Sequence, residues 1–124
     1  MRNFHYPGRS PTFSTSGMVA CSHPLASRTA LTALEKGGNA VDAALAAALV
    51  LPICEPHMTG LYGDMFALIK HPNSKKIIGL NGSGKSPSAL NAAFLRSQGE
   101  KRILPQSPHS ITLPGAVFAF ETLA

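Results

Sequence analysis

An apolar segment at residues 40–51 constrains the fold of this chain more than any other feature. Two glycines and Asn39 precede it. Asn39 can accept hydrogen bonds from the amides of the first helical turn, and Asp42 places a negative charge there, where the helix dipole favours it. Because Asp42 is the only polar residue of the segment, we expect a helix that other elements cover on most sides. Its length of ~18 Å is too short for the ~30 Å core of a bilayer, which argues against a transmembrane helix.

Length, composition and charge narrow the class of protein. The chain has 124 residues, 44% hydrophobic and 14% charged, as expected for one globular domain. Its net charge is +5, but the basic residues are scattered, so neither nucleic acid nor a membrane is expected as a partner. Residues 1–13 contain no apolar core of a secretory signal, which predicts a cytoplasmic protein with Cys21 and Cys54 reduced.

Turn residues and apolar runs divide the chain into expected elements. Residues 1–16 carry prolines and glycines and predict an extended arm, while residues 17–124 are expected to form the domain. Pro24 suits the first position of a helix that Gly37 ends, and Ser86 with Pro87 suits the start of another. The expected elements are a strand at 17–21, helices at 24–36 and 40–51, an antiparallel hairpin of strands at 65–70 and 76–81, a helix at 87–97 and a last helix from 115. Helices layered on an antiparallel sheet make an α+β fold.

Residues 79–86 read Gly-Leu-Asn-Gly-Ser-Gly-Lys-Ser and satisfy the pattern G-x-x-x-x-G-K-[ST] of a phosphate-binding loop. They lie between an expected strand and an expected helix, as such a loop requires. However, Pro87 lacks the N–H that the first helical turn would direct at a phosphate. The strand also belongs to a hairpin, whereas phosphate loops follow a parallel strand. A Gly-rich turn explains the segment as well, and a small nucleotide-binding module stays an alternative function.

Two cysteine–histidine pairs supply side chains of the types that bind zinc. Cys21 and His23 precede the apolar helix, and Cys54 and His57 follow it, but these spacings are not usual for a Cys₂His₂ site. Buried structural cysteines account for the residues equally well. We therefore predict no metal site and no cofactor, and a cysteine nucleophile lacks an evident group to orient its histidine.

Two positions after the apolar helix have both a functional and a structural interpretation. Glu55 is a candidate general base, or a carboxylate that holds the amides of its loop. The glycines of residues 60–64 allow backbone to approach a ligand, or they form a tight turn into the next strand. The sequence does not choose between these interpretations.

Five blocks of sequence follow one another in a specific order: GMVACSHPLAS at 17–27, GGNAVDAA at 37–44, EPHMTG at 55–60, NGSGKSP at 81–87 and LPGAV at 113–117. These blocks closely resemble the opening of the γ-glutamyltransferase (γ-glutamyltranspeptidase) family. They are most similar to the branch without a signal peptide, which includes γ-glutamyltransferase-like proteins and oxamate amidohydrolases. The resemblance covers nearly all of this chain but only the opening of a family member.

The resemblance implies the N-terminal portion of an N-terminal-nucleophile (Ntn) hydrolase, an αββα sandwich that is incomplete in this chain. Such a proenzyme cuts itself into a large and a small chain, and the first Thr of the small chain attacks the amide. That Thr is expected beyond Ala124, so no catalytic residue is assigned here, the fragment alone is expected to be inactive, and its partner is the small chain. The full-length protein is expected to hydrolyse or transfer acyl groups of γ-glutamyl or related amides of the glutathione type. The alternatives are an amidohydrolase of oxamate or another small amide, and a non-catalytic remnant.

The resemblance also places one substrate site within this chain. In typical members an Arg-Glu pair stands where this chain, aligned on Pro87, has Ser83 and Gly84, and the Arg holds the substrate α-carboxylate through a bidentate contact. The missing pair argues against strict γ-glutamyl specificity. Lys85 is the only cation of the turn and can supply a point charge to a carboxylate, although a solvated surface lysine is the alternative. Ser83, Gly84 and Lys85 are the expected substrate-binding residues.

Overall fold

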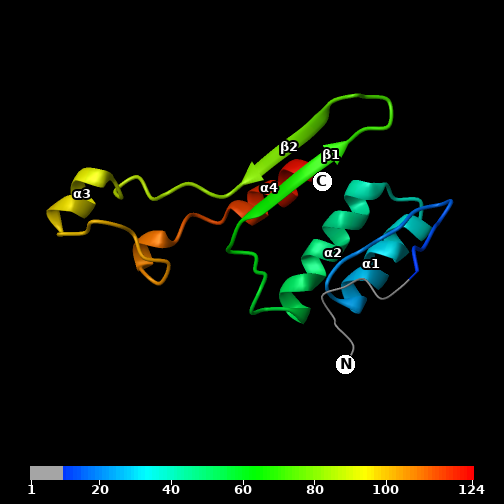
Figure 1. The fold of residues 1–124 in the computed structure, drawn as a ribbon, viewed down its shortest axis with the longest axis horizontal. Coiled ribbons are helices and arrows are strands. Elements are labelled where there is room, and N and C mark those ends of the chain that lie inside the picture. The colour runs from blue at the N-terminus through cyan, green and yellow to red at the C-terminus, as the bar shows by residue number, and fades with distance from the viewer. Residues whose placement is uncertain (1–9) are drawn as a thin grey trace.

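A hairpin separates a helix pair from an extended excursion of the chain in the computed structural model, which describes residues 10–124 (Figure 1). Most of the predicted arm at residues 1–16 falls on residues 1–9, outside the described part, so the division into arm and domain stays a prediction. The elements in order are α1 (Pro24–Glu35), α2 (Ala40–Cys54), β1 (Met65–Lys70), β2 (Ile77–Gly82), α3 (Ala92–Ser97), a short 3₁₀ turn η1 (Pro108–Ser110) and α4 (Gly115–Leu123). The predicted α+β class is confirmed.

The helices α1 and α2 form a closely packed pair because small side chains meet at their interface. Ala26 and Ala30 of α1 pack with Ala43 and Ala47 of α2, and the exposed fraction of these four residues ranges from 0% to 7%. Alanine at the contact lets the two helix backbones approach each other. The buried surface of α1 is therefore made of alanine side chains.

Local signals define both ends of α1, as predicted. Pro24 occupies its first turn, where a missing N–H costs nothing. At the other end Gly37 has φ +89°, and its amide donates to the Leu34 carbonyl at 3.0 Å. The Gly38 amide donates to the Ala33 carbonyl at 2.9 Å. These two bonds form a Schellman motif, which glycine favours because it adopts a left-handed conformation without strain.

A reciprocal capping box begins α2. The Asn39 side chain accepts from the amides of Val41 and Asp42 at 2.7 and 3.2 Å, and the Asn39 amide donates to an Asp42 carboxylate oxygen at 2.8 Å. Asn39→Ala is expected to lower the free energy of unfolding by about 1 kcal/mol, because it leaves first-turn amides without an acceptor. Chemical denaturation of the complete protein measures the loss.

The matched control is Asn91→Ala. Asn91 also caps a helix, accepting from the Phe94 amide at 2.9 Å, but α3 buries no residue. Since α3 contributes little to the packed structure, its cap should affect global unfolding less. Equal losses from the two variants would contradict the view that α2 belongs to the core.

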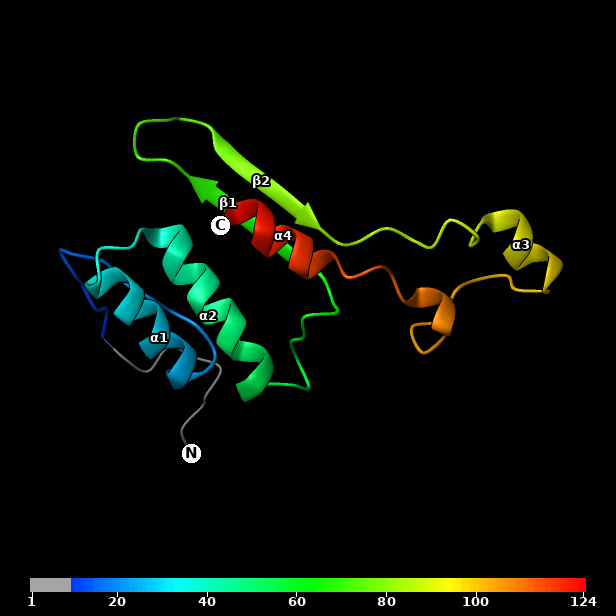
Figure 2. The same ribbon diagram turned by 180° about the vertical axis from the view of Figure 1, so that it is seen from behind.

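The hairpin is antiparallel, as predicted, and pairs Met65 with Gly82 at one end and Lys70 with Ile77 at the other. Its two faces differ. Alternate residues of β1 that begin with Met65 are half-buried, and α4 lies across that face (Figure 2). On the opposite face Leu68 is 81% exposed. Within residues 10–124 the sheet has two strands and is covered on one side.

Three sequence-based expectations about elements are wrong. Residues 17–21 are not a strand, because no strand within residues 10–124 pairs with them. The helix expected at 87–97 begins at Ala92, because Asn91 caps it and outcompetes the signal at Pro87. The helix expected at 40–51 continues to Cys54 with Pro52 inside it.

Part of the cover expected for α2 lies within the described residues. Among the described residues α1 is its main neighbour, and α4 contacts it weakly. Leu49 and Ile53 are 52% and 82% exposed. The apolar segment therefore carries more hydrophobic surface than residues 10–124 can cover. Across those residues, every helix is too short or too polar to cross a membrane.

Candidate functional site

Two segments far apart in the sequence come together beyond the end of β2, where the chain leaves the hairpin and where it later returns to begin α4 (Figure 1). The Leu113 amide donates to the Lys85 carbonyl at 2.9 Å, and the Thr112 hydroxyl donates to the Ser83 carbonyl at 3.2 Å. Together they line a pocket of about 400 Å³, which we call the turn pocket. Its lining residues are Asn81, Gly82, Ser83, Gly84, Lys85, Leu113, Pro114, Gly115 and Phe118.

Glycines make this close approach of two backbones possible. Gly84 has φ +72°, and a Cβ built on it would overlap the Leu113 carbonyl oxygen. A Cβ on Gly115 would overlap the Gly82 carbonyl oxygen and the Gly84 nitrogen. A Cβ on Gly82 would lie 2.7 Å from the Cβ of Ala119. The turn after β2 is therefore held against the start of α4 by contacts that only glycine permits.

The turn pocket has free donors, because the Gly84 and Lys85 amides find no acceptor within residues 10–124. Three of its oxygens already accept hydrogen bonds: the Asn81 side-chain oxygen from the Ser83 amide at 3.0 Å, and the carbonyls of Ser83 and Lys85 from residues 112 and 113. Lys85 is the only cation, and no Asp or Glu is present, among the described residues that line the pocket. The geometry thus suits an anionic group.

The three substrate-binding residues expected from the sequence all line this pocket. Ser83 and Gly84 are half-buried, and Lys85 is exposed. Sequence reasoning missed the second wall, Leu113 to Gly115 with Phe118. The only available signal was the LPGAV block at 113–117, which by itself says nothing about where it packs.

The phosphate-loop interpretation of residues 79–86 is not supported by the structure around them. The strand before the turn is one arm of an antiparallel hairpin, with Gly79 inside it opposite Leu68. No helix follows directly, because α3 begins only at Ala92. A phosphate loop needs a helix N-terminus at its end to supply amides. This segment therefore lacks the geometry for nucleotide binding.

The cysteine–histidine pairs make ordinary structural contacts. The Cys21 Sγ lies 2.9 Å from the Ser27 hydroxyl, and His23 Nδ1 accepts from the Leu25 amide at 3.2 Å. Both Cys21 and Cys54 are free. Within residues 10–124 no group of three or more His, Cys, Asp or Glu side chains is placed to hold a metal ion.

Glu55 and the glycines after it also hold the fold together. A Glu55 carboxylate oxygen accepts from the Ser22 hydroxyl at 2.7 Å, which ties the end of α2 to the start of α1. The Gly63 carbonyl accepts from the Ala116 amide at 3.0 Å, so the turn at 60–64 anchors the first turn of α4. The tight turn expected at 60–64 is present, with the Gly63 amide donating to the Gly60 carbonyl at 3.4 Å. The Glu55 carboxylate has a structural contact as well, but with the Ser22 hydroxyl and not with the amides of its own loop.

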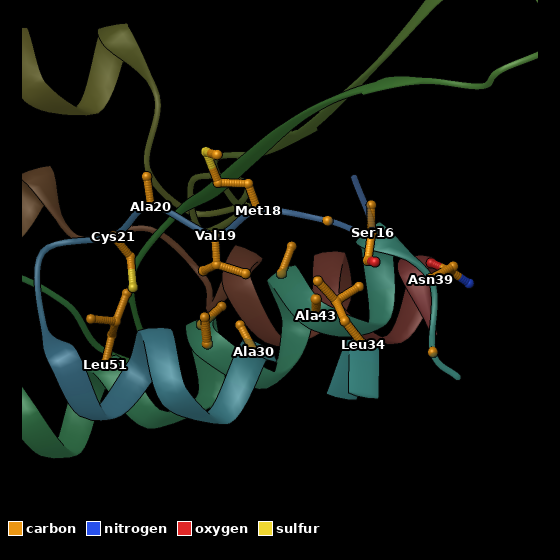
Figure 3. A pocket seen from close by; sticks show the side chains of 16 residues that line it. Ser16, Met18, Val19, Ala20, Cys21, Ala30, Leu34, Asn39, Ala43 and Leu51 are labelled. Atoms are coloured by element: carbon orange, nitrogen blue, oxygen red, sulfur yellow. The ribbon is translucent and has the colours of Figure 1, made fainter. Parts of the chain in front are cut away.

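A larger pocket of about 630 Å³ lies between residues 16–21 and the helix pair (Figure 3). Met18, Val19 and Leu51 are among its lining side chains. None of the described residues that line it is charged. It can hold apolar groups but offers no charged side chain to orient a polar substrate, so the turn pocket is the better candidate site.

Comparison with known proteins matches the chain to one protein family and to proenzymes. Residues 26–124 match the family described as Gamma-glutamyltranspeptidase. The chain is 39% identical over 111 residues to the glutathione hydrolase-like YwrD proenzyme of Bacillus subtilis, covering 88% of this chain and 21% of that protein. It is 38% identical over 110 residues to the oxamate amidohydrolase proenzyme of Klebsiella pneumoniae, covering 87% of this chain and 20% of that protein. The chain thus spans about a fifth of the length of these relatives.

Solved structures agree with the sequence matches. The γ-glutamyltranspeptidase of Helicobacter pylori superposes with a TM-score of 0.76 at 31% identity, over 92% of this chain and 33% of that one. The cephalosporin acylase of Bacillus halodurans also gives 0.76, at 36% identity, over 98% of this chain and 24% of that one. The described residues therefore form part of the Ntn-hydrolase fold, as the resemblance implied. On the family match over 26–124 and these two superpositions, the chain belongs to the γ-glutamyltranspeptidase family.

Proposed function

We propose that this chain is the N-terminal part of a self-cleaving proenzyme whose full-length form hydrolyses or transfers the acyl group of γ-glutamyl or related amides. The support is the family match over residues 26–124 and the similarity to proenzymes named for glutathione and oxamate hydrolysis. The nucleophilic Thr and the small chain lie in the part of the proenzyme beyond this chain. A cytoplasmic location is part of the proposal, supported by the two free cysteines, Cys21 and Cys54.

The observation that carries the proposal for this chain's own residues is the turn pocket. The hydrogen bond from the Leu113 amide to the Lys85 carbonyl anchors the backbone from which the Lys85 ammonium extends. Ser83 adds a hydroxyl on the same turn, and its backbone is held at both ends, by Asn81 and by Thr112. In this proposal Lys85 and Ser83 bind the carboxylate of the substrate, and Gly84 lets the turn approach α4.

Lys85→Ala in the complete proenzyme is expected to raise KM about tenfold or more, because a hydrogen bond to a charged group contributes roughly 1.5–3 kcal/mol. Self-cleavage and kcat should change little, since Lys85 binds the substrate but takes no part in the chemical step. Steady-state kinetics on an amide substrate, with gel analysis of the two chains, measures both.

Lys101→Ala is the matched control. Lys101 is an exposed cation on the excursion between α3 and η1, outside the lining of the turn pocket. Its removal should leave KM unchanged. An unchanged KM for Lys85→Ala would remove Lys85 from the substrate site, and failure of the wild-type proenzyme to split into two chains would favour the non-catalytic remnant.

A further inference from the structure

We propose that Cys21 and Cys54 form a site of reversible oxidation, at which a small disulfide compound converts the two thiols into a disulfide bond. The bond would join the segment before α1 to the last residue of α2. Both cysteines are free in this structure. The proposal goes beyond amide hydrolysis and uses none of the residues that line the turn pocket.

The fold brings the two cysteines to the same end of the helix pair. Residues 36–39 join α1 to α2, and the two helices run antiparallel, so the start of α1 lies beside the end of α2 (Figure 2). Cys21 stands just before α1, which begins at Pro24, and Cys54 is the last residue of α2. The two thiols therefore belong to neighbouring ends of the packed pair.

A hydrogen bond between the residues next to the two cysteines holds these ends together. The Ser22 hydroxyl donates to a Glu55 carboxylate oxygen at 2.7 Å. Ser22 follows Cys21 in the chain, and Glu55 follows Cys54. A disulfide forms only between cysteines whose backbones lie close together. This hydrogen bond links the two backbones one residue away from each thiol.

The two side chains also share one side of the helix pair. Figure 3 shows the Cys21 side chain pointing toward the helices, and it lines the larger pocket together with Ala47 and Leu51 of α2. Residues that are three, four or seven positions apart lie on one face of a helix. Cys54 follows Leu51 by three positions and Ala47 by seven. Cys54 therefore continues the face of α2 that lines the pocket with Cys21.

The exposure of the two thiols sets the order of the reaction. Cys21 is exposed, with its Sγ 2.9 Å from the Ser27 hydroxyl, and Cys54 is half-buried. The Cys21 thiolate attacks one sulfur of the small disulfide, forms a mixed disulfide and expels one thiolate. The Cys54 thiolate then attacks the Cys21 sulfur and expels the second thiolate. The two protein thiols lose two electrons and two protons, and the small disulfide is reduced to two thiols.

The new bond would close a loop of the chain that contains both α1 and α2. Such a cross-link restricts the unfolded chain and therefore stabilises the folded one. We expect the oxidised protein to melt several degrees higher than the reduced protein. In the cytoplasmic location proposed above, the bond would form transiently and would respond to oxidation.

The complete protein is incubated with 2-hydroxyethyl disulfide, which carries no amide and is therefore independent of the proposed hydrolysis. Free thiols are then blocked with iodoacetamide, and the protein is digested without reduction. We expect mass spectrometry to find the peptide of Cys21 joined to the peptide of Cys54, and the melting temperature to rise by several degrees. Dithiothreitol should reverse both changes. Recovery of the two cysteines only as blocked thiols or as mixed disulfides would overturn the proposal.

Three variants test the pairing itself. Cys54→Ser should keep a mixed disulfide on Cys21 and lose the rise in melting temperature, because the second attack has no nucleophile. Ser22→Ala removes the hydrogen bond to Glu55 and should slow cross-linking several-fold. Glu55→Gln is the matched control: its amide oxygen still accepts from Ser22, so cross-linking should proceed at the wild-type rate. Equal rates for Ser22→Ala and the wild type would contradict the view that this contact brings the two thiols together.

Discussion

Gly84→Ala is expected to lower the free energy of unfolding by about 3 kcal/mol, and to lower the apparent melting temperature of the complete protein by several degrees. Two physical terms add. An L-residue at φ +72° is strained by roughly 1–2 kcal/mol. In addition, the new Cβ would overlap the carbonyl oxygen of Leu113, so the turn must separate from the start of α4. Scanning fluorimetry on purified variants measures the change.

Gly99→Ala separates the two terms. Gly99 has a similar φ, +79°, but a Cβ there meets no atom within 4 Å. Its substitution should cost only the backbone strain of about 1 kcal/mol. The excess loss in Gly84→Ala then measures the contact with Leu113. Equal losses for the two variants would mean that the turn and the 112–115 segment are not held together as the hydrogen bonds indicate.

Ala119→Leu is expected to destabilise the protein by about 3 kcal/mol and to raise KM for the amide substrate. Ala119 is 0% exposed in α4, and its Cβ lies against the backbone of Gly82 in β2. A leucine side chain cannot fit between helix and strand, so α4 must move away from the hairpin. Because Gly115 at the start of α4 forms one wall of the turn pocket, the displacement reaches the proposed substrate site.

The control for Ala119→Leu is Val117→Leu on the same helix. Val117 is 48% exposed, so one added methylene group meets solvent rather than a packed strand. Neither the melting temperature nor KM should change measurably. Combined thermal melts and kinetics test both variants. If Ala119→Leu lowered stability without affecting KM, the turn pocket would not depend on the packing of α4.

Most elements could be predicted because their signals act over a few residues. Pro24 and the Gly37 C-cap define α1, the capping box of Asn39 and Asp42 begins α2, and both are present as expected. The hairpin follows from two apolar runs joined by a turn. Where two local signals competed, the sequence did not reveal the stronger one: Asn91, and not Ser86 with Pro87, starts α3.

The expectations that failed depended on neighbours that are distant in the chain. Residues 17–21 have the composition of a strand, but a strand exists only when another strand pairs with it, and none within residues 10–124 does. Within residues 10–124 the apolar α2 is covered mainly by α1, and Leu49 remains 52% exposed. The composition of a segment indicates which of its side chains could be buried. Whether they are buried depends on which other segments pack against them.

For the candidate site, too, the sequence predicted one part and the tertiary structure decided the other. The sequence by itself determined the family, through five ordered blocks, and the turn residues Ser83 and Gly84 that stand in place of the usual Arg-Glu pair, followed by Lys85. Only the tertiary structure decided that Thr112 and the residues after it form the second wall, since the bond from Thr112 to Ser83 spans 29 residues. The residue type at a position fixes the chemistry of its side chain. Its hydrogen-bond partners and the space around it depend on contacts between segments that are distant in the sequence.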